Sequence, residues 1–181
     1  MQVSLDGFVG GPNGELDWVV WDWDEELKNY VGELTEPVDN ILLGRKLAEG
    51  FIPYWSAAAA NPEHPELFAA KKFDATPKIV FSKTLRDSKW ENTKLAKGNV
   101  IDEVNNLKKL DGKDIIVYGG ADFVSSLMKF GLINDYHVFI NPVAIGKGLT
   151  IFRSIENKLD LGLVNSKSFK CGIVVLHYKP K

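Results

Sequence analysis

The sequence is poor in several features that mark particular classes of protein. Its single cysteine, Cys171, excludes an internal disulfide and makes a reducing cytoplasm the default expectation. No apolar stretch approaches the roughly 20 residues that a membrane-spanning helix needs, and no basic segment followed by an apolar one indicates a signal peptide. The formal net charge of −2 gives no electrostatic case for nucleic acid or an anionic membrane as a partner.

Histidines and nucleotide-binding fingerprints are scarce as well. The three histidines are His64, His137 and His177, and their spacing does not suggest a metal site, so no metal is expected. Neither GxGxxG after the first strand nor GxxxxGK[ST] is present, which removes the usual Rossmann and P-loop signatures. Any phosphate site must therefore be local and built in another way.

The pattern of apolar residues predicts an α/β protein. The 181 residues are 45% hydrophobic, which is ordinary for a globular chain, and we expect a single domain over 1–181. Strands alternate with helices up to about residue 130, and strands alone follow, with the last two at about 159–169 and 172–179. This order predicts a sheet that is parallel in its main body and ends in antiparallel strands. We expect prolines, Pro53 first, to break the stretch after the short helix that begins near Arg45.

Three predicted strand ends carry groups that suit a phosphate. Ligands of open α/β sheets bind beyond the carboxyl ends of the strands, against helix N-termini. The segments concerned are "ILLGRK" with Gly44, Arg45 and Lys46, "VFSKTL" with Ser82, Lys83 and Thr84, and "VYGGAD" with Gly119 and Gly120. Two cations at a helix N-terminus oppose the helix dipole, and a bound anion would resolve that conflict. Equally, the basic pair can be a solvated helix end and the glycine pair only a tight turn.

Three blocks of the sequence also resemble a known family when taken in order. They are "VSLDGFVGGPNGELDW", "NILLGRK" with "KIVFSKTL", and "DIIVYGGADFVSSLMKFGLINDYHVFINPVAIGKG". Together they resemble the dihydrofolate-reductase-like superfamily, in the branch similar to the C-terminal reductase domain of riboflavin-biosynthesis deaminase-reductases. The resemblance covers nearly the whole chain. It implies a three-layer α/β/α fold with a central mixed, mainly parallel sheet, NADPH as the hydride donor, and a homodimer.

The same resemblance assigns residues to the parts of NADPH. The glycine pair, joined by a cis peptide in dihydrofolate reductases, would meet the pyrophosphate together with the amides that follow it. The "GRK" element would hold the 2′-phosphate, and "FSKT" would lie along the adenosine. The loop from Asp6 to Trp18 would cover the nicotinamide, with Gly14 near that end. The cofactor-binding residues expected in this way are Val3, Trp18, Gly44, Arg45, Lys46, Ser82, Lys83, Gly119, Gly120, Ala121, Asp122 and Phe123.

The substrate side is less well defined, because the sequence departs from the family pattern there. Leu47 replaces the threonine of dihydrofolate reductases, and Tyr118 stands where riboflavin-pathway reductases carry an acid. Asp6, Asp24, Tyr118 and water are the candidate proton donors, although Asp6 suits a turn before Gly7 better. Three tryptophans follow in this region, Trp18, Trp21 and Trp23. They would form a flat surface against the substrate or pack in the core and the covering loop.

The function predicted from the sequence is an oxidoreductase. It would transfer hydride from NADPH to a small imine or carbonyl substrate, with pteridine or pyrimidine compounds as the candidate class. The expected activity is similar to that of dihydrofolate reductase or of 5-amino-6-(5-phosphoribosylamino)uracil reductase, with the substrate unassigned. The alternative is a non-catalytic nucleotide-binding module that retains the reductase fold.

Overall fold

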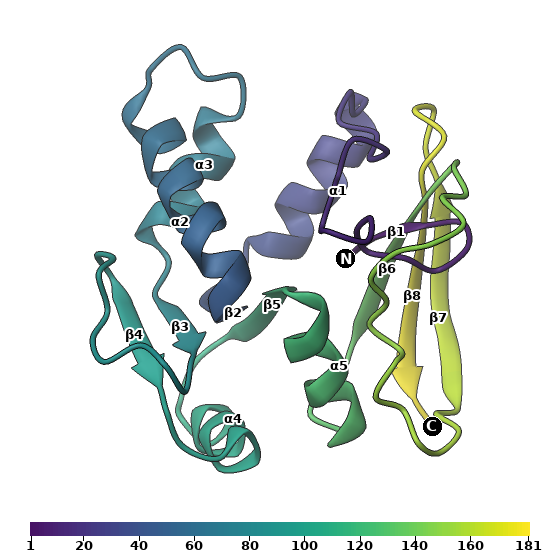
Figure 1. Cartoon of the computed structure of the whole chain (residues 1–181). Helices are drawn as coiled ribbons and strands as arrows, with labels where there is room; N and C mark the ends of the chain where they lie inside the picture. Colours follow the sequence, from purple (N-terminus) through teal and green to yellow (C-terminus); the bar gives the residue numbers. More distant parts are fainter. The chain divides into compact units, whose positions relative to one another are not determined.

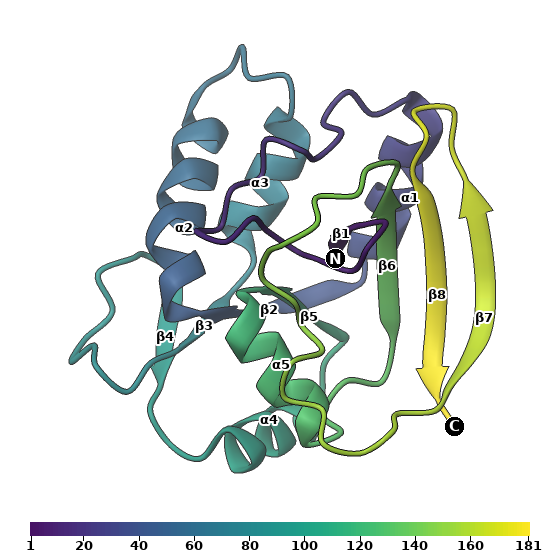
Figure 2. The same ribbon diagram turned by 45° about the vertical axis from the view of Figure 1, so that its right-hand side comes forward.

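The computed structural model describes residues 1–181, which form two compact units (Figures 1 and 2). The first unit consists of Met1–Val31 and Val124–Lys181, and the second of Gly32–Phe123. Each unit contains its own four-stranded sheet. The expectation of a single domain over 1–181 stays a prediction.

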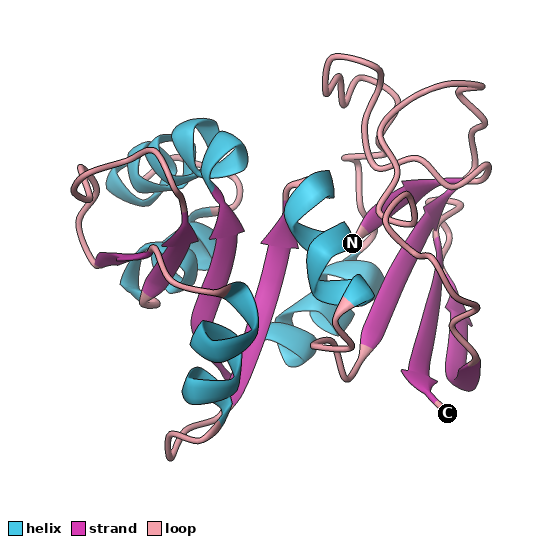
Figure 3. Cartoon of the chain, turned by 60° about the horizontal axis from the view of Figure 1, so that its bottom comes forward, coloured by secondary structure: helices cyan, strands magenta, loops and turns pink.

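The sheet of the second unit is entirely parallel, with strand order β4-β3-β2-β5. Its elements are β2 (Val38–Gly44), α2 (Arg45–Ala60), α3 (Leu67–Ala75), β3 (Lys78–Phe81), β4 (Thr93–Ala96), α4 (Val100–Lys108) and β5 (Asp114–Gly119). The chain steps from β2 to β3 to β4 in one direction and then places β5 on the other side of β2. Because crossovers between parallel strands are right-handed, α4 must cover the face opposite to α2 and α3. Figures 1 and 3 show this arrangement.

The core of this unit lies between β2, β3 and the helices α2 and α3. β2 is buried at four consecutive residues, as expected for a strand covered on both faces. Ile41, Leu43 and Val80 of the sheet pack with Ile52 of α2 and Phe73 of α3. This packing fixes the carboxyl ends of the strands in place.

Helix α2 is longer than the sequence suggested. It runs for 16 residues and contains Pro53 in its interior, so the prediction that this proline ends the helix is wrong. Pro53 is exposed, while Ala48 and Ile52 on the other face of α2 are buried in the core. Burial of the apolar face therefore outweighs the local preference of proline to end a helix.

A buried lysine ties α3 to β3. Lys78 is 1% exposed, and its Nζ donates to the carbonyl oxygens of Phe73 (3.0 Å), Asp74 (2.8 Å) and Thr76 (2.8 Å). These carbonyls end α3 and have no partner within the helix. Burial lowers the pKa of Lys78, although Asp74 opposes that shift. The ammonium group therefore serves as an internal cap of the helix.

The sheet of the first unit is mixed, with strand order β1-β6-β8-β7. β1 pairs with β6 in parallel, whereas β6 with β8 and β7 with β8 are antiparallel. The strands are β1 (Gln2–Ser4), β6 (Tyr136–Asn141), β7 (Leu161–Ser168) and β8 (Val174–Pro180). The predicted antiparallel pairing of the last two strands is confirmed. The sequence favours a half-buried strand position for Cys171; the residue is half-buried, but it lies in the turn between β7 and β8.

Two further helices, α1 and α5, complete the fold. α1 (Glu25–Thr35) is capped by Asp24, whose Oδ1 accepts a hydrogen bond of 2.9 Å from the amide of Leu27. α5 (Ala121–Lys129) follows the glycine pair directly, with its buried face formed by Val124, Leu127 and Met128.

The long loop between β1 and α1 is attached to the first unit at two places. On one side, the amide of Val9 donates to the carbonyl of Leu149 (2.8 Å), and the amide of Leu149 donates to the carbonyl of Gly10 (2.8 Å). On the other side, the amide of Val20 donates to Oδ1 of Asn141 (2.9 Å), a fully buried side chain at the end of β6.

The predicted fold class is confirmed: the protein is α/β, with a parallel sheet and antiparallel strands at the C-terminal end of the chain. None of its helices combines the length and apolar character needed to cross a membrane.

Candidate coenzyme site

Three strand ends of the second unit meet at one edge of its sheet. β2 is the central strand here, since it pairs with β3 on one side and β5 on the other. Gly44 at its end is in register with Phe81, and Leu43 with Gly119. The strand order reverses at β2 and β5, and such a switch point opens a crevice beyond the carboxyl ends of the strands. The sequence-predicted segments around Gly44, Ser82 and Gly119 therefore lie beside one another.

The glycines allow very close approach between two of these turns. A Cβ atom on Gly44 would lie 3.0 Å from the Cβ of Phe123 and 3.2 Å from the amide nitrogen of Gly120. Gly119 has a φ of 141°, which side chains of L-residues rarely allow, and the Gly119–Gly120 peptide is cis. The cis bond is the one that the family resemblance implied. Glycine backbone from the two turns therefore lies in close contact between the starts of α2 and α5.

Both helices direct their N-termini to this edge of the sheet. Arg45 opens α2 immediately after Gly44, and Ala121 opens α5 immediately after Gly120. No side chain caps α2 at Gly44, and its first turn contains no acidic residue. The first amides of a helix lack partners within it and lie at the positive end of its dipole. The pair of N-termini therefore forms a place suited to an anion.

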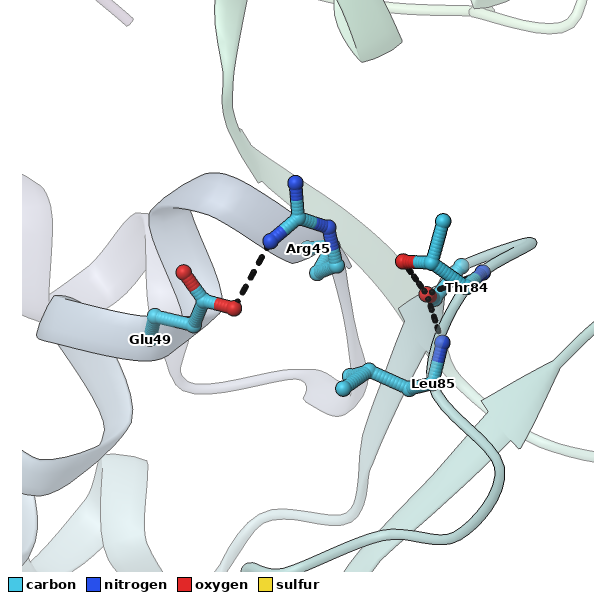
Figure 4. Close-up of polar contacts among 5 residues, drawn as sticks. Arg45, Glu49, Thr84 and Leu85 are labelled. Carbon is cyan, nitrogen blue, oxygen red and sulfur yellow. Dashed lines mark hydrogen bonds and ion pairs between the residues drawn. The ribbon is translucent and has the colours of Figure 1, made fainter.

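The basic pair at the start of α2 is partly compensated within the helix. Arg45 Nη1 lies 2.8 Å from Oε1 of Glu49, one turn later (Figure 4). The guanidinium group has five N–H donors, and this ion pair leaves others for a second acceptor. Lys46 is exposed. The ion pair between Arg45 and Glu49 is therefore partly exposed to solvent, and it compensates the charge of Arg45 only weakly.

The "FSKT" segment forms a tight turn after β3. The buried Oγ of Ser82 accepts hydrogen bonds from the amides of Thr84 (3.2 Å) and Leu85 (3.0 Å), as drawn in Figure 4. Ser82 therefore shapes the turn, while Lys83 is exposed beside it. Sequence reasoning found the segment but not this division of roles, which depends on where the hydroxyl points.

Tyr118 has an aromatic environment next to the glycine pair. Its ring centroid lies 5.4 Å from that of Phe51 in α2 and 5.8 Å from that of Phe73 in α3. Tyr118 is 36% exposed, and burial raises the pKa of its hydroxyl to about 12. The phenol therefore stays protonated at physiological pH and can donate a hydrogen bond to a ligand.

The two carboxylate candidates lie in the first unit and already have structural partners. Asp6 accepts hydrogen bonds from Ser4 Oγ and from the amides of Ile145 and Gly146, and these bonds lower its pKa. Asp24, besides capping α1, accepts a hydrogen bond from the amide of Cys171, and the amide bonds lower its pKa too. Both groups are therefore poor proton donors at neutral pH.

The remaining predicted residues of the nicotinamide end also belong to the first unit. Val3 is buried in β1, and Trp18 lies in the long loop, where its Nε1 donates to the carbonyl of Glu15 (3.0 Å). Trp21 is exposed, and Trp23 donates to the carbonyl of Val20. The roles of Val3 and Trp18 in cofactor binding stay predictions.

Sequence reasoning missed one cluster of ionisable side chains. The spacing of the histidines suggested no cluster, but His137 and His177 face each other across β6 and β8, with Asp135 beside them. The residues are 40 positions apart in the sequence, and only the antiparallel register brings them together. Burial, with a contribution from His177, lowers the pKa of His137 to about 4.

Comparison with known proteins places the chain in a family. Residues 1–175 match the model of the RibD C-terminal domain. The chain belongs to this family. The uncharacterized protein YyaP of Bacillus subtilis (strain 168) is 34% identical to it over 98% of this chain and 91% of that protein.

Solved structures agree with the family assignment at the level of the fold. The diaminohydroxyphosphoribosylaminopyrimidine deaminase/5-amino-6-(5-phosphoribosylamino)uracil reductase of Thermotoga maritima has a TM-score of 0.70 and 17% identity, covering 99% of this chain and 55% of that one. Dihydrofolate reductase from Enterococcus faecalis, complexed with NADP(H), has a TM-score of 0.59 and 16% identity, covering 99% and 93%. The resemblance predicted from the sequence is thus confirmed. The RibD C-terminal domain family supports an oxidoreductase, while the homodimer stays a prediction.

Proposed function

We propose that the chain is an NADPH-dependent reductase that transfers hydride to the imine or carbonyl carbon of a small substrate. The observation that carries the proposal is the convergence of two helix starts, α2 without a side-chain cap and α5, with glycine backbone between them and Arg45 and Lys46 beside it. A dinucleotide with an extra ribose phosphate matches this arrangement, since it needs one anion site on backbone and a second on cations. The family membership supports the same reading.

Each part of the site has its own task in this proposal. The amides of Gly120 to Phe123 bind the pyrophosphate at the start of α5. Arg45 and Lys46 bind the 2′-phosphate, and the turn shaped by Ser82, with Lys83, lies along the adenosine. Bound NADPH supplies the hydride, while the chain orients it and excludes water.

The proton that completes the reduction needs a separate source. Asp6 and Asp24 are held ionised by hydrogen bonds, whereas the hydroxyl of Tyr118 is protonated and adjoins the glycine pair in the sequence. A phenol with so high a pKa is a weak acid but a good hydrogen-bond donor. We therefore assign Tyr118 to orienting the acceptor and an ordered water to proton delivery.

Binding measurements with four nucleotides test the proposal directly. The fluorescence of the five tryptophans should change saturably with NADPH and NADP, and far less with NADH or FMN. Absence of NADPH binding below millimolar concentration contradicts the reductase. NADPH binding without oxidation by any dihydropteridine or aminopyrimidine acceptor favours the non-catalytic nucleotide-binding module instead.

A methyl group at Gly120 should weaken NADPH binding without unfolding the protein. The nearest atom to a Cβ at this position is the Cβ of Leu47, 3.9 Å away in the first turn of α2. The Gly120→Ala side chain would therefore fit the free protein and project between the two helix starts. We expect NADPH to bind at least roughly tenfold more weakly, about 1.4 kcal/mol, by fluorescence titration.

A matched glycine variant controls for effects on stability. Gly32 in α1 also has open space around its Cβ position, and alanine there should add up to about 1 kcal/mol of helix stability. NADPH affinity of Gly32→Ala should equal that of the unmodified protein. Unchanged affinity in Gly120→Ala, with its thermal unfolding also unchanged, would show that the pyrophosphate does not lie against this backbone.

A further inference from the structure

A second potential site lies on the sheet of the first unit. Asp135 directly precedes β6, His137 is in β6, and His177 in β8 is its register partner in the antiparallel ladder. The two imidazole rings are stacked with centroids 4.1 Å apart and planes 16° apart. Asp135 Oδ1 lies 2.7 Å from His177 Nε2. These three side chains are called the β6–β8 cluster below.

The geometry of the β6–β8 cluster is that of a ligand set. Each side chain offers one ligating atom, and the three atoms all lie within 4.8 Å of one another. Ligands of a tetrahedral zinc ion are separated by about 3.3 Å, given bond lengths near 2.0–2.1 Å. Small side-chain rotations would therefore suffice to bring the atoms around one ion, with the pairing of strands unchanged.

The hydrogen bonds of the protein leave one group in this cluster unexplained. Nδ1 of His137 is buried and has no partner. Buried polar atoms are nearly always paired, and an unpaired one costs about 1–3 kcal/mol. A metal ion held by the cluster would give this imidazole nitrogen a partner beside the second imidazole and its carboxylate.

We propose that Asp135, His137 and His177 bind a divalent transition-metal ion of the zinc type. Two imidazoles and one carboxylate suit zinc and its neighbours, whereas magnesium and calcium prefer oxygen ligands throughout. Three protein ligands leave a fourth position for water. The residues belong to the first unit and include none of those assigned to NADPH, so the site does not depend on the proposed reductase function.

A neighbouring lysine gives the proposal a directional test. Lys179 Nζ lies 3.4 Å from the same oxygen of Asp135, and its side chain is 57% exposed, so it can move into solvent. A metal ion bound to this carboxylate would lie close to the ammonium group and be repelled by its positive charge. Removing the positive charge should therefore tighten metal binding, which a weak association with isolated surface histidines would not show.

The experiment measures zinc binding to the tag-free, chelator-treated full chain in competition with a chromophoric chelator. We expect one ion per chain, binding at least roughly tenfold weaker in His177→Asn and in Asp135→Asn, and tighter binding in Lys179→Gln. Cobalt(II) should give the visible absorption of a four-coordinate site. His64→Gln, which removes the one histidine outside the cluster, should bind zinc like the unmodified chain.

Three results would overturn the proposal. They are no zinc binding tighter than about 100 μM, equal losses in His64→Gln and His177→Asn, and unchanged or weaker zinc binding in Lys179→Gln. Asp135 is 41% exposed at its side chain, so Asp135→Asn should fold even where a histidine variant does not. Circular dichroism of each variant verifies that folding.

Discussion

Replacing Arg45 by alanine is expected to weaken NADPH binding by about 1.5–3 kcal/mol, or roughly 10- to 150-fold. The guanidinium group uses one nitrogen on Glu49, and its other donors can grip a phosphate at the start of α2. NADH lacks the 2′-phosphate, so its already weak affinity should hardly change. Titration of both coenzymes into both proteins, followed by fluorescence, gives the comparison.

Glu49 provides the matched control for this variant. Glu49→Gln removes the charge that pairs with Arg45 but keeps the arginine and the length of the helix. The exposed ion pair contributes only about 0.3–0.5 kcal/mol to stability, so the variant should fold normally. It should bind NADPH as well as, or better than, the unmodified chain. Equal losses of NADPH and NADH in Arg45→Ala would place the 2′-phosphate elsewhere.

Replacing Lys78 by methionine is expected to lower the free energy of unfolding by roughly 3 kcal/mol. Methionine fills a similar volume but cannot donate, which leaves the carbonyls of Phe73, Asp74 and Thr76 without the donor that they share. It also removes the positive charge from the negative end of the α3 dipole. Urea unfolding, monitored by circular dichroism, measures the loss.

Lys71 serves as the comparison for this second variant. Lys71 lies in α3, the helix that Lys78 caps from β3, but it is exposed, so Lys71→Met should change the free energy of unfolding by no more than about 0.5 kcal/mol. A similarly small effect of Lys78→Met would mean that water replaces the ammonium group without cost. The three carbonyls would then not depend on Lys78.

Local signals in the sequence were sufficient for most of the secondary structure. The apolar run that ends at Gly44 predicted β2, and the apolar pattern of the last part of the chain predicted β7 and β8. These secondary-structure signals depend only on residues that are close together in the sequence. Pro53 shows the limit, because its local preference was overridden by the burial of α2 against the sheet.

The candidate coenzyme site was accessible to sequence reasoning for a related reason. Carboxyl ends of parallel strands share one edge of the sheet, so motifs after three strands could be expected to converge. Lys78 and the β6–β8 cluster could not be anticipated in this way. The burial of a lysine and the register of two strands 40 residues apart depend on the completed packing, which no short pattern records.

The long loop between β1 and α1 is fixed to the rest of its unit at two places. At one end, the carbonyl of Gly10 accepts a hydrogen bond from the amide of Leu149. At the other end, the amide of Val20 donates to the side chain of Asn141. Between them, the amide of Gly11 donates to the carbonyl of Glu15, which keeps the stretch folded on itself. The segment is therefore held by hydrogen bonds near both of its ends, at Gly10 and at Val20. Displacing the loop from this unit therefore requires breaking the backbone pairing with Leu149 or the hydrogen bond to the buried Asn141.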